Sequence, residues 1–208
     1  MFSQKTSATR RAPQRQRGRE RVAALLEAAA DCFIEKGFEA ATMTEIAARA
    51  GAAIGSLYQF FPTKEALAQA LLDRYAEALY ARLGTLAARS AGWDSDQLGA
   101  QLIRLLVAFR RRYPAFVVLA ESVTVPSEHS LAIRRRLRAE LQALLARHAP
   151  SLAPADLHAV TIVVQQLMKA AVAVNAEPGL NGRKAALDQL QQALQLYLRE
   201  ALKARATP

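Results

Sequence analysis

Apolar residues recur at intervals of three and four along nearly the whole chain, which is the spacing of one face of an α-helix. Ala and Leu dominate these stretches, runs of β-branched residues are short, and Gly or Pro separates one stretch from the next. No segment has the pattern of a convincing strand. The chain is therefore predicted to be all-α, with nine helices. We expect them at residues 17–36, 43–50, 54–60, 64–83, 96–113, 115–123, 127–148, 155–175 and 182–205.

The same pattern divides the chain into three parts. Residues 1–16 are polar and basic, contain Pro13 and few large apolar side chains, and are predicted to form a disordered arm. Residues 17–63 are predicted to form a small three-helix domain, and residues 64–208 a larger helical domain. Gly37 is expected to end the first helix, and Gly84 the fourth, because glycine favours helix ends.

Residues 42–61 have the pattern of a helix-turn-helix. Thr42 and Glu45 have the spacing of a capping box, which would begin the first helix, and Gly51 supplies the turn. In such a unit the second helix enters the major groove of DNA while the first crosses the backbone. Small and apolar side chains of both helices are expected to form the buried contact between them: Ile46, Ala47, Ala50, Leu57 and Phe61, with Phe60 also in the core.

The stretch GFEAATMTEIAARAGAAIGSLYQFFPTKEAL resembles the N-terminal domain of the TetR family of transcriptional repressors, over residues 21–67. This resemblance implies three DNA-binding helices, with about six more behind them that form a ligand pocket and a dimer interface. Two positions depart from the family pattern. Ala53 stands where the family usually has a Ser or Thr N-cap, and Ala41 where it often has Thr.

Charged side chains are absent between Arg49 and Lys64, so the second helix of the motif has no Arg or Lys with which to bind guanine. We therefore expect base contacts from methyl groups, short polar groups and bare backbone: Ala53, Ile54, Gly55, Ser56 and Gln59. Phosphate contacts would hold the register, and their candidates are Thr42, Thr44, Tyr58 and Lys64. The alternatives are that Thr42 is only a helix cap and that Tyr58 is a core tyrosine with an exposed hydroxyl.

The last two long helices, at residues 155–175 and 182–205, are apolar on more than one face. They would be buried both within their own domain and against a second copy, and the resemblance also implies a homodimer through these helices. The alternative is that they fill one large core. Large side chains near helix ends are candidates for a ligand pocket, although each could equally be plain core: Phe109, Tyr113, Phe116 and Met168.

Catalytic and metal-binding patterns are absent from the sequence. One cysteine, Cys32, excludes a disulfide framework within the chain and is expected to be a small core residue. The histidines lack metal-ligand spacing, and no HExxH, G-x-S-x-G or phosphate-cradling loop occurs. We therefore predict neither enzyme activity, nor a cofactor, nor a metal.

A membrane location is not predicted. The longest stretch without Asp, Glu, Lys or Arg is residues 50–63, which is 14 residues, whereas a spanning helix needs about 18 or more. The Arg-rich start also fits an organelle transit peptide, but it leads directly into the motif. We expect a cytoplasmic protein.

These observations predict a regulator that binds double-stranded DNA. The specific hypothesis is a homodimeric repressor on a palindromic operator, released by a mostly apolar small molecule. The alternatives are the same fold with a protein partner or without an effector, a basic helical module that coats nucleic acid or membrane without sequence preference, and an enzyme that uses the pocket.

Positive charge is concentrated at the start of the chain. The whole sequence has 28 Lys and Arg against 18 Asp and Glu, a net charge of +10, and residues 1–21 hold 7 positive and 1 negative residue. Residues 22–64 hold 3 positive and 5 negative residues, so the helix-turn-helix itself is not basic. The arm would therefore bind DNA electrostatically while a neutral helix reads the sequence.

Deletion of residues 2–16 is expected to flatten the salt dependence of DNA binding. It removes four positive charges, those of Lys5, Arg10, Arg11 and Arg15, and each cation on a phosphate adds to the salt slope. The measurement is the affinity of the full-length and shortened chains for one duplex over a series of salt concentrations. An unchanged slope would show that the arm does not contact DNA.

Overall fold

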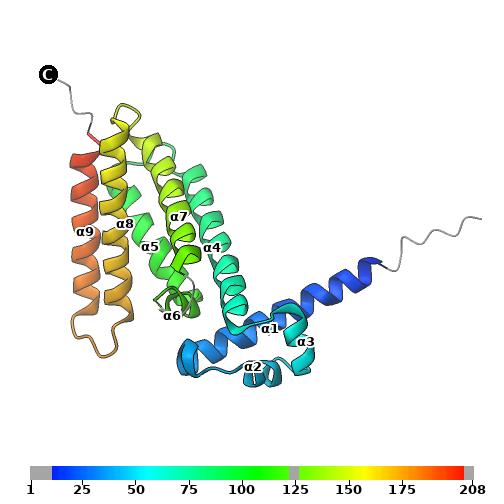
Figure 1. The fold of residues 1–208 in the computed structure, drawn as a ribbon. Coiled ribbons are helices and arrows are strands. Elements are labelled where there is room, and N and C mark those ends of the chain that lie inside the picture. Colours follow the sequence, from blue (N-terminus) through cyan, green and yellow to red (C-terminus); the bar gives the residue numbers. More distant parts are fainter. Residues whose placement is uncertain (1–10, 122–126, 204–208) are drawn as a thin grey trace, which may run out of the picture. The chain divides into compact units, whose positions relative to one another are not determined.

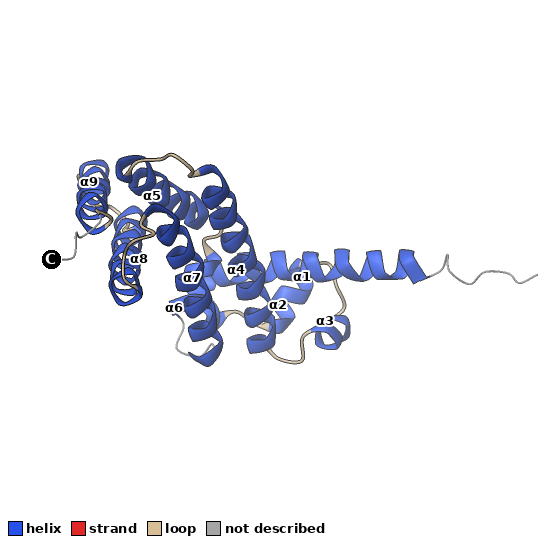
Figure 2. Ribbon diagram, turned by 90° about the horizontal axis from the view of Figure 1, so that it is seen from above, coloured by secondary structure: helices blue, strands red, loops and turns tan. Residues whose placement is uncertain are grey.

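The computed structural model describes residues 11–121 and 127–203, and these residues form nine α-helices and no strand (Figures 1 and 2). The all-α prediction is confirmed. The helices are α1 (Arg11–Ala40), α2 (Met43–Arg49), α3 (Ile54–Phe60), α4 (Lys64–Arg89), α5 (Ser95–Arg112), α6 (Ala115–Glu121), α7 (Ser127–His148), α8 (Pro154–Ala176) and α9 (Arg183–Ala201).

The chain forms two compact units. Among the described residues, the first comprises residues 11–72, 115–121 and 127, and the second residues 73–114 and 128–203. This division differs from the boundary predicted between residues 63 and 64. The first two turns of α4 belong to the first unit, where Leu67 and Leu71 are buried, and α6 belongs there as well because it packs on α1.

Two predicted helix ends, the start of α1 and the end of α4, each differ from the structure by six residues. Helix α1 begins at Arg11, so the last residues of the predicted arm are helical, while residues 1–10 lie outside the described part of the chain. Helix α4 continues through Gly84 to Arg89. One glycine lowers the stability of a helix by only about 1 kcal/mol relative to alanine. Burial of Leu83 and Leu86 on either side of Gly84 outweighs that loss. At Gly37 the prediction holds, because its φ of 78° interrupts α1.

The core of the first unit is centred on the inward face of α1. Leu25, Ala29, Cys32 and Phe33 are all buried, as their spacing predicts, and the rings of Phe33 and Phe38 lie 5.4 Å apart. Burial raises the pKa of the Cys32 thiol. The cysteine therefore stays protonated and behaves as a small apolar residue.

The second unit is built around the packing of α5, α8 and α9. Its buried cluster includes Leu98 and Leu102 of α5, Val164 of α8 and Leu194 of α9. Helices α8 and α9 lie side by side in both views (Figures 1 and 2). Helices α5 and α9 approach closely at Gly99, where a Cβ atom would lie only 3.1 Å from Cγ of Gln195.

Helix α8 has the length and hydropathy of a membrane-spanning helix, alone among the described helices. A search for long charge-free runs misses this helix, because Lys169 interrupts its apolar sequence. One side of the helix, from Leu157 to Val172, packs into the core of the second unit. A core helix meets the same criteria of length and composition, so this feature is weak evidence for a membrane.

Acidification is expected to destabilise the second unit through His148. Its Nε2 lies 3.1 Å from Oγ of the buried Ser90, and burial lowers the pKa of His148, an effect that a backbone contact with Trp93 opposes in part. The unfolded chain therefore binds the proton more readily, and stability is lost as the pH falls below about 6.5. Urea unfolding at about pH 7.5 and about pH 5.5 measures the loss. His148→Gln should show a smaller loss, and an equal loss would exclude His148 as its source.

Candidate nucleic-acid interface

Helices α2 and α3 meet through a small buried contact across a glycine turn. Gly51 has a φ of 61°, the left-handed conformation that glycine adopts without strain. The amide of Ala52 donates to the carbonyl of Ala47 at 2.9 Å, which closes the turn. The apolar side chains expected at this contact are buried, except for Ala50, which is half-buried: Ile46, Ala47, Leu57 and Phe61. The predicted helix-turn-helix is therefore present.

One side of α3 is open to solvent and carries no charge. Ile54 is 40% exposed and Tyr58 49% exposed, and Gly55 and Gln59 are also exposed. Ala53 begins the helix without a side-chain cap, as expected for alanine. Phe60 is 39% exposed, so its predicted place in the core is wrong. On this short helix Leu57 faces the core, whereas the side chain of Phe60 remains partly in solvent.

Thr42 forms the predicted capping box at the start of α2. Its hydroxyl accepts a hydrogen bond from the amide of Glu45, and the Glu45 carboxylate accepts one from the amide of Thr42, both at 3.2 Å. The Lys36 ammonium and these Thr42 contacts hold the pKa of Glu45 below its usual value. The hydroxyl proton of Thr42 remains available to a phosphate, and Thr44 is exposed on the same turn.

Lys64 binds the protein's own backbone. Its Nζ donates to the carbonyl oxygens of Glu39, at 2.9 Å, and Ala41, at 3.0 Å, and lies 4.7 Å from the centre of the Phe38 ring. An ammonium has three donors, so one is left for a phosphate. The structure therefore gives Lys64 a second role, which is to tie the start of α4 to the segment before α2. The phosphate contact stays a prediction.

Two other cations near the motif are paired with carboxylates. Arg49 makes a bidentate ion pair with Glu35, with N–O distances of 2.7 and 2.6 Å, and Lys36 contacts Glu45 at 2.6 Å. The Arg49 guanidinium lowers the pKa of Glu35, so this carboxylate stays ionised. Both pairs are exposed and therefore add little stability, but they reduce the charge that these cations offer to DNA.

The structure adds Arg21 to the candidate residues. Nη1 of Arg21, on α1, lies 3.4 Å from Oγ of Ser56 on α3. It thus places a guanidinium beside a helix that has no cation of its own. In the sequence, Arg21 stands out only as part of the basic start of the chain. A signal was available, because Arg21 lies one helical turn before the buried Leu25 and therefore on a similar side of α1.

Arg21→Ala is expected to weaken DNA binding about fivefold to thirtyfold, or ~1–2 kcal/mol, because a charge-assisted phosphate contact is lost. The salt slope should fall by about one. Arg111→Ala, on an exposed position of α5, is the matched control and should leave both quantities unchanged. Fluorescence anisotropy with a labelled duplex measures them. Equal behaviour of the two variants would remove Arg21 from the interface.

The four residues predicted to line a ligand pocket do not lie together in one unit. In the second unit the ring centres of Phe109 and Tyr113 lie 4.8 Å apart with the rings tilted by 50°, and the ring centre of Tyr75 lies 4.9 Å from that of Tyr113. Met168 belongs to the buried cluster of α5, α8 and α9. Phe116 lies on α6, in the first unit. Sequence position near helix ends did not reveal these different surroundings.

A metal site is not formed by the residues that the structure describes, since no three His, Cys, Asp or Glu side chains among them could hold one ion.

Comparison with known proteins gives matches over both units. The family model described as "Bacterial regulatory proteins, tetR family" matches residues 25–71. The model "Tetracyclin repressor-like, C-terminal domain" matches residues 94–198, which is half of the chain. The first match contains the whole of α2 and α3, and the second contains α5 to α8 and most of α9.

Curated relatives are similar over a short segment. The HTH-type transcriptional repressor KstR2 of Mycobacterium tuberculosis is 45% identical over 58 residues, which are 28% of this chain and 29% of that protein. The HTH-type transcriptional activator FasR of Mycolicibacterium smegmatis is 45% identical over 60 residues, 29% of this chain and 27% of that protein. The chain thus matches less than a third of the length of these relatives.

Solved structures share the fold over most of the chain. A TetR-family transcriptional regulator from Streptomyces coelicolor has a TM-score of 0.63 at 24% identity, covering 88% of this chain and 99% of that chain. The regulator FadR from Bacillus subtilis, in complex with stearoyl-CoA, has a TM-score of 0.66 at 14% identity, covering 88% and 98%. At these identities the likeness concerns the fold alone.

Proposed function

This chain belongs to the TetR family of bacterial transcriptional regulators, and we propose that it binds a palindromic operator as a homodimer and is released from it by a small molecule. Its role in transcriptional regulation follows from the family. The operator symmetry, the dimer and the release are the parts that we propose.

The exposed, uncharged side of α3 is the observation that carries this proposal. Leu57 holds the helix on the core, and Ile54, Tyr58 and Gln59 are left facing solvent. Methyl and amide groups of this kind can discriminate base edges in the major groove, whereas a cationic surface would favour phosphates of any sequence. The nearby cations Arg21 and Lys64 suit a positioning role. This distribution supports sequence-specific binding over a module that coats nucleic acid.

Selection of bound duplexes from a random pool tests sequence-specific binding. The purified full-length chain is expected to enrich an inverted repeat whose two halves are centred about one DNA turn, or a multiple of it, apart. A footprint on the promoter of its own gene then shows whether the chain controls its own expression. Retention of all duplexes alike, with a steep salt dependence, would instead support the coating module.

Dimer formation is supported by apolar side chains that α8 and α9 leave uncovered. Val163 of α8 is 38% exposed and Leu196 of α9 is 50% exposed, although both helices also contribute to the core of the second unit. A two-fold axis through such a surface would bring the same residues of two chains together. The cytoplasmic location that we propose agrees with this role.

Release by a ligand is supported by similarity and by one cluster of aromatic residues. FadR, a protein of the same fold, was solved with stearoyl-CoA. In this chain Tyr75, Phe109 and Tyr113 form an aromatic group in the second unit that could contact an apolar compound. Such a compound releases DNA only if it binds the DNA-free state more tightly than the DNA-bound state.

Repression, rather than activation, is the direction that we propose. The DNA-binding segment does not decide it, because one relative with 45% identity over that segment is a repressor and the other an activator. A reporter gene behind the selected operator tests the direction. Expression of the reporter should fall when the chain is present. It should recover on addition of a ligand, which a screen of apolar compounds would identify. A rise in expression on addition of the chain would make it an activator.

A further inference from the structure

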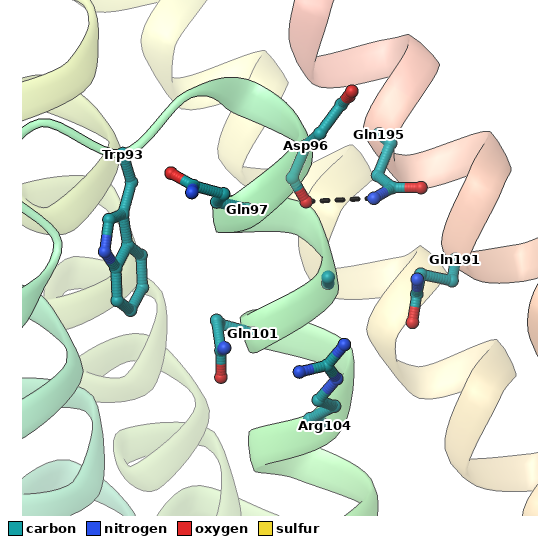
Figure 3. Close-up of a pocket in the computed structure, with 8 residues that line it drawn as sticks. Trp93, Asp96, Gln97, Gln101, Arg104, Gln191 and Gln195 are labelled. Carbon is teal, nitrogen blue, oxygen red and sulfur yellow. Dashed lines mark hydrogen bonds between the residues drawn. The ribbon is translucent and has the colours of Figure 1, made fainter.

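The surface of the second unit has two adjoining open hollows. Their volumes are about 360 and 350 Å³, each in the range of small-ligand sites. Three residues line both of them: Trp93, Gln101 and Arg104. Figure 3 shows the first hollow, with Trp93 before the start of α5, Gln101 and Arg104 along α5, and Gln191 on α9.

Positive charge dominates the lining. Arg82 and Arg89 of α4 line the second hollow together with Arg104. Asp96 is the acidic residue in the lining of the first hollow, and it is neutralised by an ion pair with Arg199, whose Nε lies 2.7 Å from Oδ1. Among the described residues, Arg89 and Arg104 have no hydrogen-bond or ion-pair partner, so their donors face solvent.

Amide groups add hydrogen-bond donors to these arginines. The Gln97 side chain uses its oxygen to accept from the amide of Asp94, at 3.2 Å, which leaves its NH₂ group free to donate. Gln101 and Gln191 have no hydrogen bond within the described part of the chain. Guanidinium and amide donors that line one hollow without an unpaired carboxylate are the surroundings that a carboxylate or phosphate group favours.

Trp93 gives the site an aromatic wall. The side chain is half-buried and packs against the buried cluster of the second unit, while it also lines both hollows. An indole that is fixed on one side offers its other surface to a planar ring. The second hollow also holds Arg82, whose guanidinium is kept over the rings of Phe109 and Tyr113, 5.6 and 5.5 Å from their centres.

From this arrangement we propose that the hollows of the second unit form a binding site for a small aromatic anion. The ring of the ligand packs against Trp93, and its carboxylate or phosphate group binds Arg104, with Arg82 and Arg89 adding positive charge. This site is distinct from the helix-turn-helix, and its ligand class differs from the apolar compound of the proposed function. The two proposals therefore succeed or fail separately.

Intrinsic fluorescence tests the site directly, since Trp93 is the single tryptophan of the chain. Phenyl phosphate and benzoate, which combine a ring with a charge, serve as probes for the full-length protein. Benzyl alcohol supplies the ring alone and inorganic phosphate the charge alone. We expect a saturable change in Trp93 fluorescence with at least one of the two aromatic anions. The affinity for benzyl alcohol and for inorganic phosphate should be lower by about tenfold or more.

Two substitutions separate the two contacts. Arg104→Ala is expected to lower the affinity for the aromatic anion about tenfold or more, because it removes a charge-assisted hydrogen bond. Arg135→Ala, an exposed arginine on α7, is the matched control and should bind as the unsubstituted protein does. Trp93→Leu, followed by calorimetry, should bind phenyl phosphate no better than inorganic phosphate. Circular dichroism spectra identical to that of the unsubstituted protein show that each variant is folded.

Three outcomes would overturn the proposal. The first is the absence of saturable binding of either aromatic anion. The second is equal weakening by Arg104→Ala and Arg135→Ala, which would indicate a general effect of net charge. The third is equal affinity for inorganic phosphate and for the aromatic anion that binds, which would show that Trp93 contributes no contact.

Discussion

Replacing Leu57 with alanine is expected to lower the free energy of unfolding of the first unit by about 2–5 kcal/mol, the usual cost of a large-to-small substitution in a packed core. Leu57 is fully buried and is the one buried side chain of α3. Helix α3 packs against α2, and a packed core relaxes only partly into the space that a lost side chain leaves. Because α3 depends on this side chain for its place on the core, DNA binding should be lost as well.

Ile54→Ala is the matched control on the same helix. Ile54 lies one turn before Leu57 but is 40% exposed, so its truncation should change stability by no more than about 0.5 kcal/mol. DNA binding should nevertheless weaken, since Ile54 is a candidate for contact with bases. Urea unfolding and anisotropy with the selected operator give the two quantities. Equal losses of stability in both variants would show that α3 packs differently from the structure.

A double substitution on α8 and α9, Val163→Glu with Leu196→Glu, is expected to make the protein monomeric. Both side chains are exposed in the single chain, so glutamate should leave its fold intact. In a dimer through these helices four carboxylates would be buried without partners, at a cost of several kcal/mol. Loss of the second half-site contact should lower operator affinity about 100-fold or more, because the two recognition helices no longer act together.

Leu131→Glu provides the control for this substitution. Leu131 of α7 is 41% exposed, much like Val163, but lies outside α8 and α9. It should leave both the mass and the operator affinity unchanged. Sedimentation gives the mass, and anisotropy the affinity. A dimer that survives the double substitution would place the interface elsewhere, and a monomer that retains full affinity would contradict binding as a dimer.

Local signals predicted the recognition motif closely. The bounds of α3 and α7 agree with the expected ranges, and Gly51 makes the turn between α2 and α3. In these places the helix ends depend on nearby residues, such as Thr42 for α2 and a proline or glycine for the others. Leu57 was expected in the buried contact of the helix-turn-helix, and it is fully buried there.

Hydrogen bonds between residues far apart in the chain could not be predicted from the sequence pattern. Lys64 reaches carbonyls 25 and 23 residues earlier in the chain, and Arg21 reaches a hydroxyl 35 residues later. The residue type indicated only that Lys64 and Arg21 would bind anions or hydrogen-bond acceptors, and not which ones. Gly84 shows the opposite case, where a local signal for a helix end was outweighed by burial on either side of it.

The uncharged side of α3 has a consequence for the chemistry of the operator itself. We propose that α3 reads bases through Ile54 and Ala53, and apolar side chains of this kind contact the C5-methyl group of thymine. Deoxyuridine lacks that methyl group, and 5-methylcytosine carries one at the equivalent position. Under this proposal, covalent modification of the pyrimidines that Ile54 and Ala53 contact would change how strongly the protein binds its operator.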